Sequence, residues 1–493
     1  MSQEKKQTLL RWQWRTILIT MVGYAMFYLL RKNFTLAMPG LSAEFGVSNT
    51  TLGIFLTLHG VIYGLSRYVV GIITDRNSAR KVLSLGLMLC AIVNILFGCS
   101  DLLAGWLVVI AGKAGEAAAI ATALGYVMGV MWMINGFLQG MGVPPCTKIL
   151  TQWIHPNELA TKMSIWNMSH SIGAGLAIAL CGYIIMPHLG LDMSADPEKV
   201  AAIASNLNVD MTDPKVAQFA SHIGAWRWCF LIPAAVGIHG SIWLYFSVKD
   251  SPSDVGLPEV VGKKKAIVTT PEEAAEHKAF VSRHVYRNRI IWTLAITNLF
   301  VYVVRFGALD WGAKILMEDR GMTFAMATTV VLLFEMVGGN LGMLFWGWAT
   351  DHIFHGKAHH TCVVCMVCAA LFLLCYWLLP DSTPWWVLMI PYMLIGFCIY
   401  GPQALLGICA ALHATNRASA TANGILGIFG YLSTIISGFG FGFIADHFGW
   451  SGVYSAMFAA SLAAVIVLLT IWKAKANGYS REDLHLEAKN TEC

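Results

Sequence analysis

Four basic residues stand inside long apolar stretches of this chain: Arg31, Lys32, Arg67 and Arg305. A charge at the centre of a bilayer costs about 2.5–3.5 kcal/mol on insertion scales, so such a residue normally faces a polar cavity and has a function. The alternative is a long side chain that extends to the membrane surface. Apolar sequence continues past Arg31 to Pro39, which argues against that alternative for Arg31.

Tyrosines precede the three arginines by three, four or seven residues, a spacing that puts both side chains on one helix face. They are Tyr24 and Tyr28 before Arg31, Tyr63 before Arg67, and Tyr302 before Arg305. A guanidinium group presents a planar fork that matches phosphate or carboxylate oxygens. The pattern predicts a site for a small anion, with phosphate favoured over carboxylate.

His170 and two acidic residues are further candidates in apolar surroundings. His170 is either a packed core histidine or a cavity-facing donor that titrates in the range where phosphate esters change charge. Asp310 and Glu335 are expected to form an ion-pair set with Lys32, which joins separate helices. The alternative for Asp310 is a position at the membrane interface.

The composition excludes several classes of protein. The 493 residues are 57% hydrophobic and only 12% charged, with mean hydropathy +0.61. A soluble domain carries about 25% charged residues, so a soluble enzyme is excluded, as is a nucleic-acid binder with an exposed basic surface. We expect no enzyme, no cofactor and no nucleic-acid partner, but an all-α protein of the lipid bilayer.

Apolar runs of about 20 residues predict twelve transmembrane helices. Six lie near 16–40, 50–73, 82–99, 123–150, 160–187 and 225–247, and six near 288–312, 324–348, 361–379, 384–411, 418–444 and 451–472. The expected organisation is an N-terminal half at 1–247, a linker at 248–287, a C-terminal half at 288–474 and a tail at 475–493. Most of the 33 Lys and Arg residues fall in the N-terminus, the linker, the tail and the loops of the same side, which predicts that both termini are cytoplasmic.

The two halves echo each other. Tyr28-Leu-Leu-Arg31 resembles Tyr302-Val-Val-Arg305, and Gly71-Ile-Ile-Thr-Asp75 resembles Gly347-Trp-Ala-Thr-Asp351, at offsets of 274 and 276 residues. Two six-helix halves in parallel repeat are typical of the major facilitator fold, with the substrate bound between the halves. Two arginines in corresponding positions suit a dianion.

A cluster of cysteines can be interpreted either as a metal site or as part of an apolar helix. The spacing Cys362-x-x-Cys365-x-x-Cys368 follows His359 and His360 and could suggest a metal site. A zinc site needs ligands that converge from separate turns or segments. We therefore interpret the cluster as thiols of an apolar helix and predict no metal.

The chain resembles the organophosphate:phosphate antiporters of the major facilitator superfamily over nearly its whole length. The motifs that carry the resemblance are Gly23-Tyr24-Ala-Met-Phe-Tyr28-Leu-Leu-Arg31-Lys32-Asn33-Phe34, Asp75-Arg76-Asn-Ser-Ala-Arg80, Phe137-Leu-Gln139-Gly140-Met-Gly142, Trp166-Asn167-Met-Ser-His170, Val301-Tyr302-Val-Val-Arg305, Tyr400-Gly401-Pro402-Gln403 and Gly427-Ile-Phe-Gly430-Tyr431.

The resemblance implies that Arg31 and Arg305 bind phosphate and that His170 joins them. It adds Trp166, Gln139 and Tyr400 to the substrate site. It also implies interhelical ion pairs for Lys32, Asp310 and Glu335, and places Arg67 where relatives usually carry lysine. The implied function is a monomeric carrier of the bacterial inner membrane, in which outward flow of inorganic phosphate drives organophosphate inward as the two halves rock.

The identity of the organophosphate stays open. Gly140-Met-Gly142-Val-Pro144 resembles glycerol-3-phosphate antiporters, whereas Arg80 and Gln403 resemble the hexose-phosphate branch and its sensor. Asn423 and Leu426 stand where the hexose-phosphate carrier has Asp and Lys, and insertions at 105–125 and 189–224 are expected to face outward. Two alternative functions stay open. The first is a membrane sensor of sugar phosphate, and the second is a carrier of a non-phosphorylated carboxylate.

Overall fold

The computed structural model describes residues 3–113, 117–260, 275, 278–414 and 418–476, and these residues form helices and no strand beyond one isolated bridge. The chain forms two compact units. Unit 1 contains 1–265, 310–332 and 438–446, and unit 2 contains 266–309, 333–437 and 447–493. Linker residues 261–274 and 276–277, which include the lysines at 263–265, and the tail from 477 lie outside the described residues. The division of the chain at 247 and 288 therefore stays a prediction.

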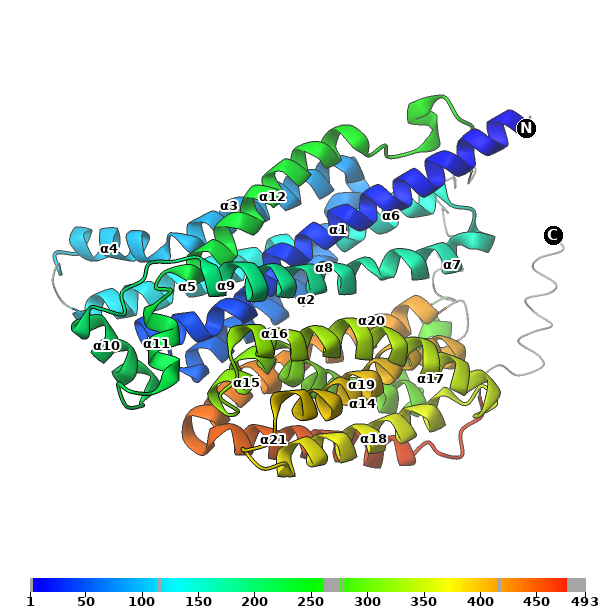
Figure 1. Cartoon of the computed structure of the whole chain (residues 1–493). Coiled ribbons are helices and arrows are strands. Elements are labelled where there is room, and N and C mark those ends of the chain that lie inside the picture. The colour runs from blue at the N-terminus through cyan, green and yellow to red at the C-terminus, as the bar shows by residue number, and fades with distance from the viewer. Residues whose placement is uncertain (1–2, 114–116, 261–274, 276–277, 415–417, 477–493) are drawn as a thin grey trace. The chain divides into compact units, whose positions relative to one another are not determined.

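The first half of the chain supplies most of unit 1 (Figure 1). Its elements are α1 (Gln3–Phe45), α2 (Asn49–Arg76), α3 (Ala79–Gly98), α4 (Ser100–Ile110), α5 (Ala117–Gln139), α6 (Val143–Trp153), α7 (Pro156–Asn167), α8 (Ser169–Ala179), η1 (Leu180–Ile185), α9 (Met186–His188), α10 (Pro197–Leu207), α11 (Pro214–Ala220), α12 (Ala225–Ser247) and η2 (Pro252–Val255).

The second half begins with η3 (Ser282–Tyr286) and α14 (Arg289–Asp310). It continues with α15 (Gly312–Glu318), α16 (Phe324–Leu332), η4 (Leu333–Gly339), α17 (Asn340–His352), α18 (Ala358–Leu378), α19 (Trp385–Ala414), α20 (Ser419–Thr434), η5 (Ile435–Gly440) and α21 (Phe441–Leu469).

Ten of the described helical stretches are long and apolar enough to cross a membrane. One of them, Thr421–Leu469, has 49 residues and would extend about 74 Å, roughly twice what a bilayer requires. It contains a break at Gly449, where φ is +68°, and therefore accounts for two spans. With α1, which has 43 residues, the helices match the twelve predicted spans of an all-α, two-half membrane protein.

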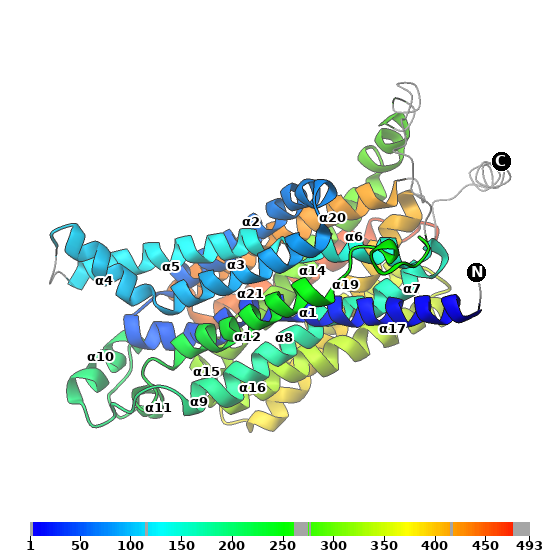
Figure 2. The ribbon, with the colours of Figure 1, turned by 90° about the horizontal axis from the view of Figure 1, so that it is seen from above.

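Helix packing in unit 1 depends on small residues. α12 packs on α3 and α1, and α1 packs on α8 (Figure 2). Gly173 lies so close to α1 that a Cβ there would be 2.6 Å from the carbonyl oxygen of Ala25. Close backbone approach at small residues is the usual way in which membrane helices associate. Here it brings α8, and with it His170, against the face of α1 that carries Tyr28.

The two predicted insertions both contain helices. The first insertion contains the second half of α4 and the first turns of α5. The second contains α10 and α11, which lie in the chain between Leu191 and Ile223, two residues joined by an isolated β-bridge. In unit 1 these elements lie at the end opposite the N-terminus (Figures 1 and 2). Glu44 anchors the second insertion, because its carboxylate accepts hydrogen bonds from Gly224 N at 2.6 Å and Trp226 Nε1 at 3.1 Å.

Unit 2 is built around α19, which packs on α18, α17 and η4. Gly338 in η4 approaches α19 so closely that a Cβ would lie 2.4 Å from the carbonyl oxygen of Met393. η4 is a π-helical segment between α16 and α17, and it contains Glu335. Single π-helical turns inside α-helices occur frequently at functional sites.

Candidate anion-binding site

Arg31 is the centre of a cluster of rings in unit 1. Its guanidinium carbon lies 5.6 Å from the ring centroid of Tyr28, one turn earlier in α1, and 4.4 Å from that of Tyr63 in α2. Arg67, one turn after Tyr63, places its own guanidinium carbon 5.9 Å from the same Tyr63 ring. Two guanidinium groups thus share one phenol, at distances where cation–π attraction orients the charges.

The rings continue from Arg31 to α7 and α8. Tyr28 lies edge-on to Tyr24 at 5.4 Å, and Tyr24 stacks on Trp166 at 5.0 Å. The imidazole of His170 is 6.0 Å from the Tyr28 ring. The structure therefore brings seven of the predicted site residues into one contiguous network: Tyr24, Tyr28, Arg31, Tyr63, Arg67, Trp166 and His170.

Local backbone geometry orients His170. The helix is interrupted at Met168, between α7 and α8, so the carbonyl of Asn167 is available to side chains. His170 Nδ1 contacts this carbonyl oxygen, and Nε2 lies 3.3 Å from the hydroxyl of Ser171. A carbonyl only accepts, so Nδ1 carries a proton, a tautomer that we assign from the network. In the neutral ring Nε2 is then an acceptor, and protonation turns it into a donor.

Three buried asparagines, which the sequence reasoning missed, hold the backbone beside Arg31. Asn94 on α3 and Asn135 on α5 donate to the carbonyl oxygen of Leu30, at 3.2 and 3.1 Å. Asn33 donates to the Asn94 side chain at 2.8 Å. Their signal in the sequence was the presence of amides in apolar spans, where polar groups need hydrogen-bonding partners.

Gln139 has a different environment from the one expected of a substrate ligand. Its amide nitrogen donates to the carbonyl oxygen of Phe27 at 3.0 Å, and the residue is only 3% exposed. This bond fastens α5 to α1. A contact between Gln139 and the substrate stays a prediction.

Arg305 forms the corresponding cluster in unit 2. Its guanidinium carbon lies 5.7 Å from the ring of Tyr302, one turn earlier in α14, and 4.9 Å from the ring of Tyr400 in α19. A third ring, that of Phe306, is 5.6 Å away. Arg305 also donates from Nη2 to the Tyr400 hydroxyl at 3.2 Å.

Tyr400 links Arg305 to an acidic residue. The Tyr400 hydroxyl donates to the Oε2 of Glu335, and both residues are fully buried at 0% exposure. The sequence predicted Tyr400 as a substrate ligand and Glu335 as an ion-pair partner of Lys32. The described geometry connects Arg305, Tyr400 and Glu335 in the order arginine, phenol and carboxylate, and both predicted roles stay predictions.

Lys32 makes an ion pair with Asp310 inside unit 1. Their side chains are 8% and 14% exposed, so water screens this pair little. Lys32 belongs to the middle of α1, whereas Asp310 is the last residue of α14. The pair therefore ties the chain at the end of α14 to α1.

Comparisons with known proteins agree with this architecture. The family model of the Major Facilitator Superfamily matches residues 20–438 and, in a second match, 314–488. Two solved structures share the fold at 14% identity. The inward-facing bacterial homolog of the human lysosomal transporter Spinster has a TM-score of 0.65, and the match covers 95% of this chain and 96% of that one. The inward-open xylose transporter XylE from E. coli has a TM-score of 0.63, and the match covers 96% of this chain and 99% of that one.

Three curated relatives span nearly the full chain. The glycerol-3-phosphate transporter of Bacillus subtilis is 32% identical over 92% of this chain and 90% of its own length. A probable hexose phosphate transport protein of Chlamydia trachomatis is 31% identical, over 94% and 91%. The membrane sensor protein UhpC of Escherichia coli is 30% identical, over 93% and 92%. This chain therefore belongs to the major facilitator superfamily, in the group of glycerol-3-phosphate and hexose phosphate transporters and their related sensor.

Proposed function

We propose that the protein is a secondary carrier that exchanges an organophosphate for inorganic phosphate across the bacterial inner membrane, with both termini in the cytoplasm. The observation that carries the proposal is the repeated arginine geometry. The guanidinium carbons of Arg31 and Arg305 lie 5.6 and 5.7 Å from the ring centroid of a tyrosine one turn earlier in the same helix. Each guanidinium group also lies near the ring of a second tyrosine from another helix.

Both arginines serve one phosphoryl group in this proposal. Aromatic rings next to both guanidinium groups orient them by cation–π attraction, and a guanidinium fork matches the oxygen atoms of a phosphoryl group. A phosphoryl group offers three oxygens and nearly two negative charges at neutral pH, enough for two such forks. Inorganic phosphate presents the same group, so a single site accepts either partner of the exchange in turn.

The remaining part of the substrate would contact the side chains around Arg31. The Tyr24, Tyr28 and Trp166 rings offer flat apolar surfaces, and His170 adds a polar ring whose Nε2 lies 3.3 Å from the Ser171 hydroxyl. This mixture suits a small polyol or sugar attached to phosphate. Glycerol 3-phosphate and sugar phosphates are the two candidates, and both are supported by the glycerol-3-phosphate and hexose phosphate transporters among the relatives.

The proposal is tested by transport in a purified system. Proteoliposomes preloaded with phosphate should take up labelled phosphate, and external organophosphates should compete for uptake. We expect no uptake into vesicles without internal phosphate, because an exchanger needs a substrate on both sides. Uptake that is independent of internal phosphate, or that a carboxylate inhibits and organophosphates do not, would contradict the proposal.

The alternative function is a membrane sensor of sugar phosphate, which the likeness to UhpC favours. The same proteoliposomes distinguish the two functions. A sensor should bind an organophosphate, measured by its protection against thermal unfolding, without exchanging it. Binding combined with exchange supports the carrier.

A further inference from the structure

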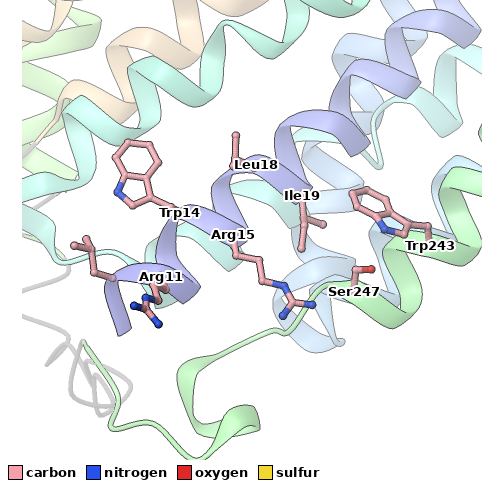
Figure 3. A pocket seen from close by; sticks show the side chains of 8 residues that line it. Arg11, Trp14, Arg15, Leu18, Ile19, Trp243 and Ser247 are labelled. Carbon is pink, nitrogen blue, oxygen red and sulfur yellow. The ribbon is translucent and has the colours of Figure 1, made fainter. Parts of the chain in front are cut away.

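A groove of about 700 Å³ runs along unit 1 between the start of α1 and the end of α12. Arg11, Trp14, Arg15 and Leu18 line it from α1, and Trp243 and Ser247 from α12. Figure 3 shows the Arg15 side chain extending from α1 toward Ser247. The groove is separate from the Arg31 cluster, whose first residue, Tyr24, follows the last groove residue of α1, Ile19, by more than one helical turn.

The charge of the groove has one sign. Arg11 and Arg15 are four residues apart on α1 and therefore project from the same face. Both are exposed, and the guanidinium carbon of Arg15 lies 4.4 Å from the ring of Trp12, which orients it. The described side chains that line the groove include no acidic residue. The groove is thus complementary to an anion.

Aromatic and apolar side chains mark the groove as a site at the membrane surface. Trp14 and Trp243 are each about two-fifths exposed, and tryptophan concentrates where lipid headgroups meet hydrocarbon. One turn beyond Trp14, Leu18 is 57% exposed, a state that suits contact with acyl chains. At the end of α12, Phe246 is 70% exposed. Along α1 the basic and aromatic side chains of residues 11–15 are therefore followed by an apolar one, Leu18.

We propose that this groove binds one anionic phospholipid. Arg11 and Arg15 bind the headgroup phosphate, the indoles of Trp14 and Trp243 flank the glycerol backbone, and an acyl chain lies against Leu18. A free phosphate ion would use only the arginines and gain nothing from the apolar part. A phospholipid matches the basic, the aromatic and the apolar parts of the groove. Two basic residues at the membrane surface favour an anionic headgroup over a zwitterionic one.

The test is native mass spectrometry of the whole purified protein with phosphatidylglycerol, cardiolipin and phosphatidylcholine of equal chain length. We expect the two anionic lipids to stay bound and phosphatidylcholine to be lost. The double substitution Arg11→Gln with Arg15→Gln should weaken anionic-lipid binding by about 30-fold, since each basic residue near the surface is worth ~1 kcal/mol. Equal retention of all three lipids by the unchanged protein would overturn the proposal.

The chain offers a matched control pair. Arg283 and Arg287 are also exposed and four residues apart, but they do not line the groove. Arg283→Gln with Arg287→Gln removes the same charge and should leave lipid binding unchanged. An equal loss in both double variants would show that net charge, not the groove, attracts the lipid.

A second measurement needs no variant, in case the altered protein does not reach the membrane. Photoactivatable phosphatidylglycerol should label the unchanged protein within residues 10–19 and 243–247. Excess inorganic phosphate should not reduce this labelling, which separates a lipid site from a phosphate site. Labelling confined to other segments, or occupation of the groove by a polypeptide in crosslinked membranes, would refute the proposal.

Discussion

Arg31 and Arg305 each contact a first ring from their own helix and a second ring from another helix, and the two clusters agree in the first and differ in the second. In both units the first ring is a tyrosine three residues earlier in the same helix. The second ring is Tyr63 from the next helix, α2, in unit 1. In unit 2 it is Tyr400 from α19, well beyond the helix that follows α14. A repeated motif within one helix therefore does not fix the surroundings that other helices supply.

The second ring decides which charges accompany each arginine. Tyr63 also contacts Arg67, so the cluster in unit 1 gathers a second cation. The Tyr400 hydroxyl donates to Glu335, so the cluster in unit 2 contains an anion. At an effective dielectric constant of about 20, charges 4 Å apart interact by about 4 kcal/mol, so this difference affects anion binding. We infer that the cluster in unit 1 attracts an anion more strongly than the cluster in unit 2.

The largest effect is expected from changing the arginines themselves. Arg31→Lys and Arg305→Lys keep the charge but lose the planar fork, and each should weaken phosphate binding about 100-fold, the value of roughly one charge-assisted hydrogen bond. The measurement is the dissociation constant of the purified proteins for organophosphate. The loss should be greater for Arg31→Lys than for Arg305→Lys.

Arg67→Lys is the control for these two variants. Arg67 is further from the Tyr63 ring than Arg31 is, and we expect lysine to replace it with little loss. Full binding by Arg31→Lys, or equal losses in all three variants, would remove the basis for two specific arginine forks.

The next effect comes from Glu335. Glu335→Gln removes the negative charge near Arg305 and keeps an acceptor for Tyr400, so binding of an anion should tighten by up to about tenfold. Tyr400→Phe breaks the link to Arg305 but leaves the carboxylate, and it should weaken binding instead. Both dissociation constants can be measured by the same assay. Tighter binding by Glu335→Gln and weaker binding by Tyr400→Phe would support the difference between the clusters. Weaker binding by both variants would show that Glu335 acts only to hold Arg305.

Much of the fold could be predicted because hydropathy alone reveals helices that cross a membrane. The repeat of Tyr28 and Arg31 at Tyr302 and Arg305 was readable as well, because a three-residue spacing fixes one helix face. The contact between Tyr63 and Arg31 was not readable, since it depends on how α2 packs against α1.

Local irregularities were equally hidden. The π-helical segment that contains Glu335 gives no periodic signal over so few residues, and nothing in the sequence indicates that the Glu335 carboxylate accepts a hydrogen bond from Tyr400. The interruption at Met168 exposes the carbonyl of Asn167 to His170, yet no proline or glycine announces it. Both features depend on tertiary packing that overrides the helical pattern.

A moderate effect is expected at the ion pair between Lys32 and Asp310. A double-mutant cycle with Lys32→Gln and Asp310→Asn should give a coupling energy of about 1 kcal/mol in thermal stability. The same cycle with Lys32→Gln and Glu335→Gln should give less, because Glu335 bonds Tyr400. Strong coupling in the second cycle would mean that the three residues act as one unit.

The smallest effect concerns His170, which is present only in the cluster of unit 1. Phosphate esters lose their second proton near pH 6, in the range where histidines also titrate. Nδ1 is held by the carbonyl of Asn167, so Nε2 is the nitrogen that changes from donor to acceptor as the pH rises. A donor attracts the dianion and an acceptor does not, so binding should weaken on the alkaline side by about threefold, the net value of one weak hydrogen bond. His170→Gln keeps a donor at every pH and should abolish this decline, while substrate titration affects both proteins equally. Dissociation constants between about pH 5.5 and 8 provide the measurement. Superimposable profiles would show that His170 is a packed core residue, and the advantage of unit 1 would then rest on Arg31 and Arg67 alone.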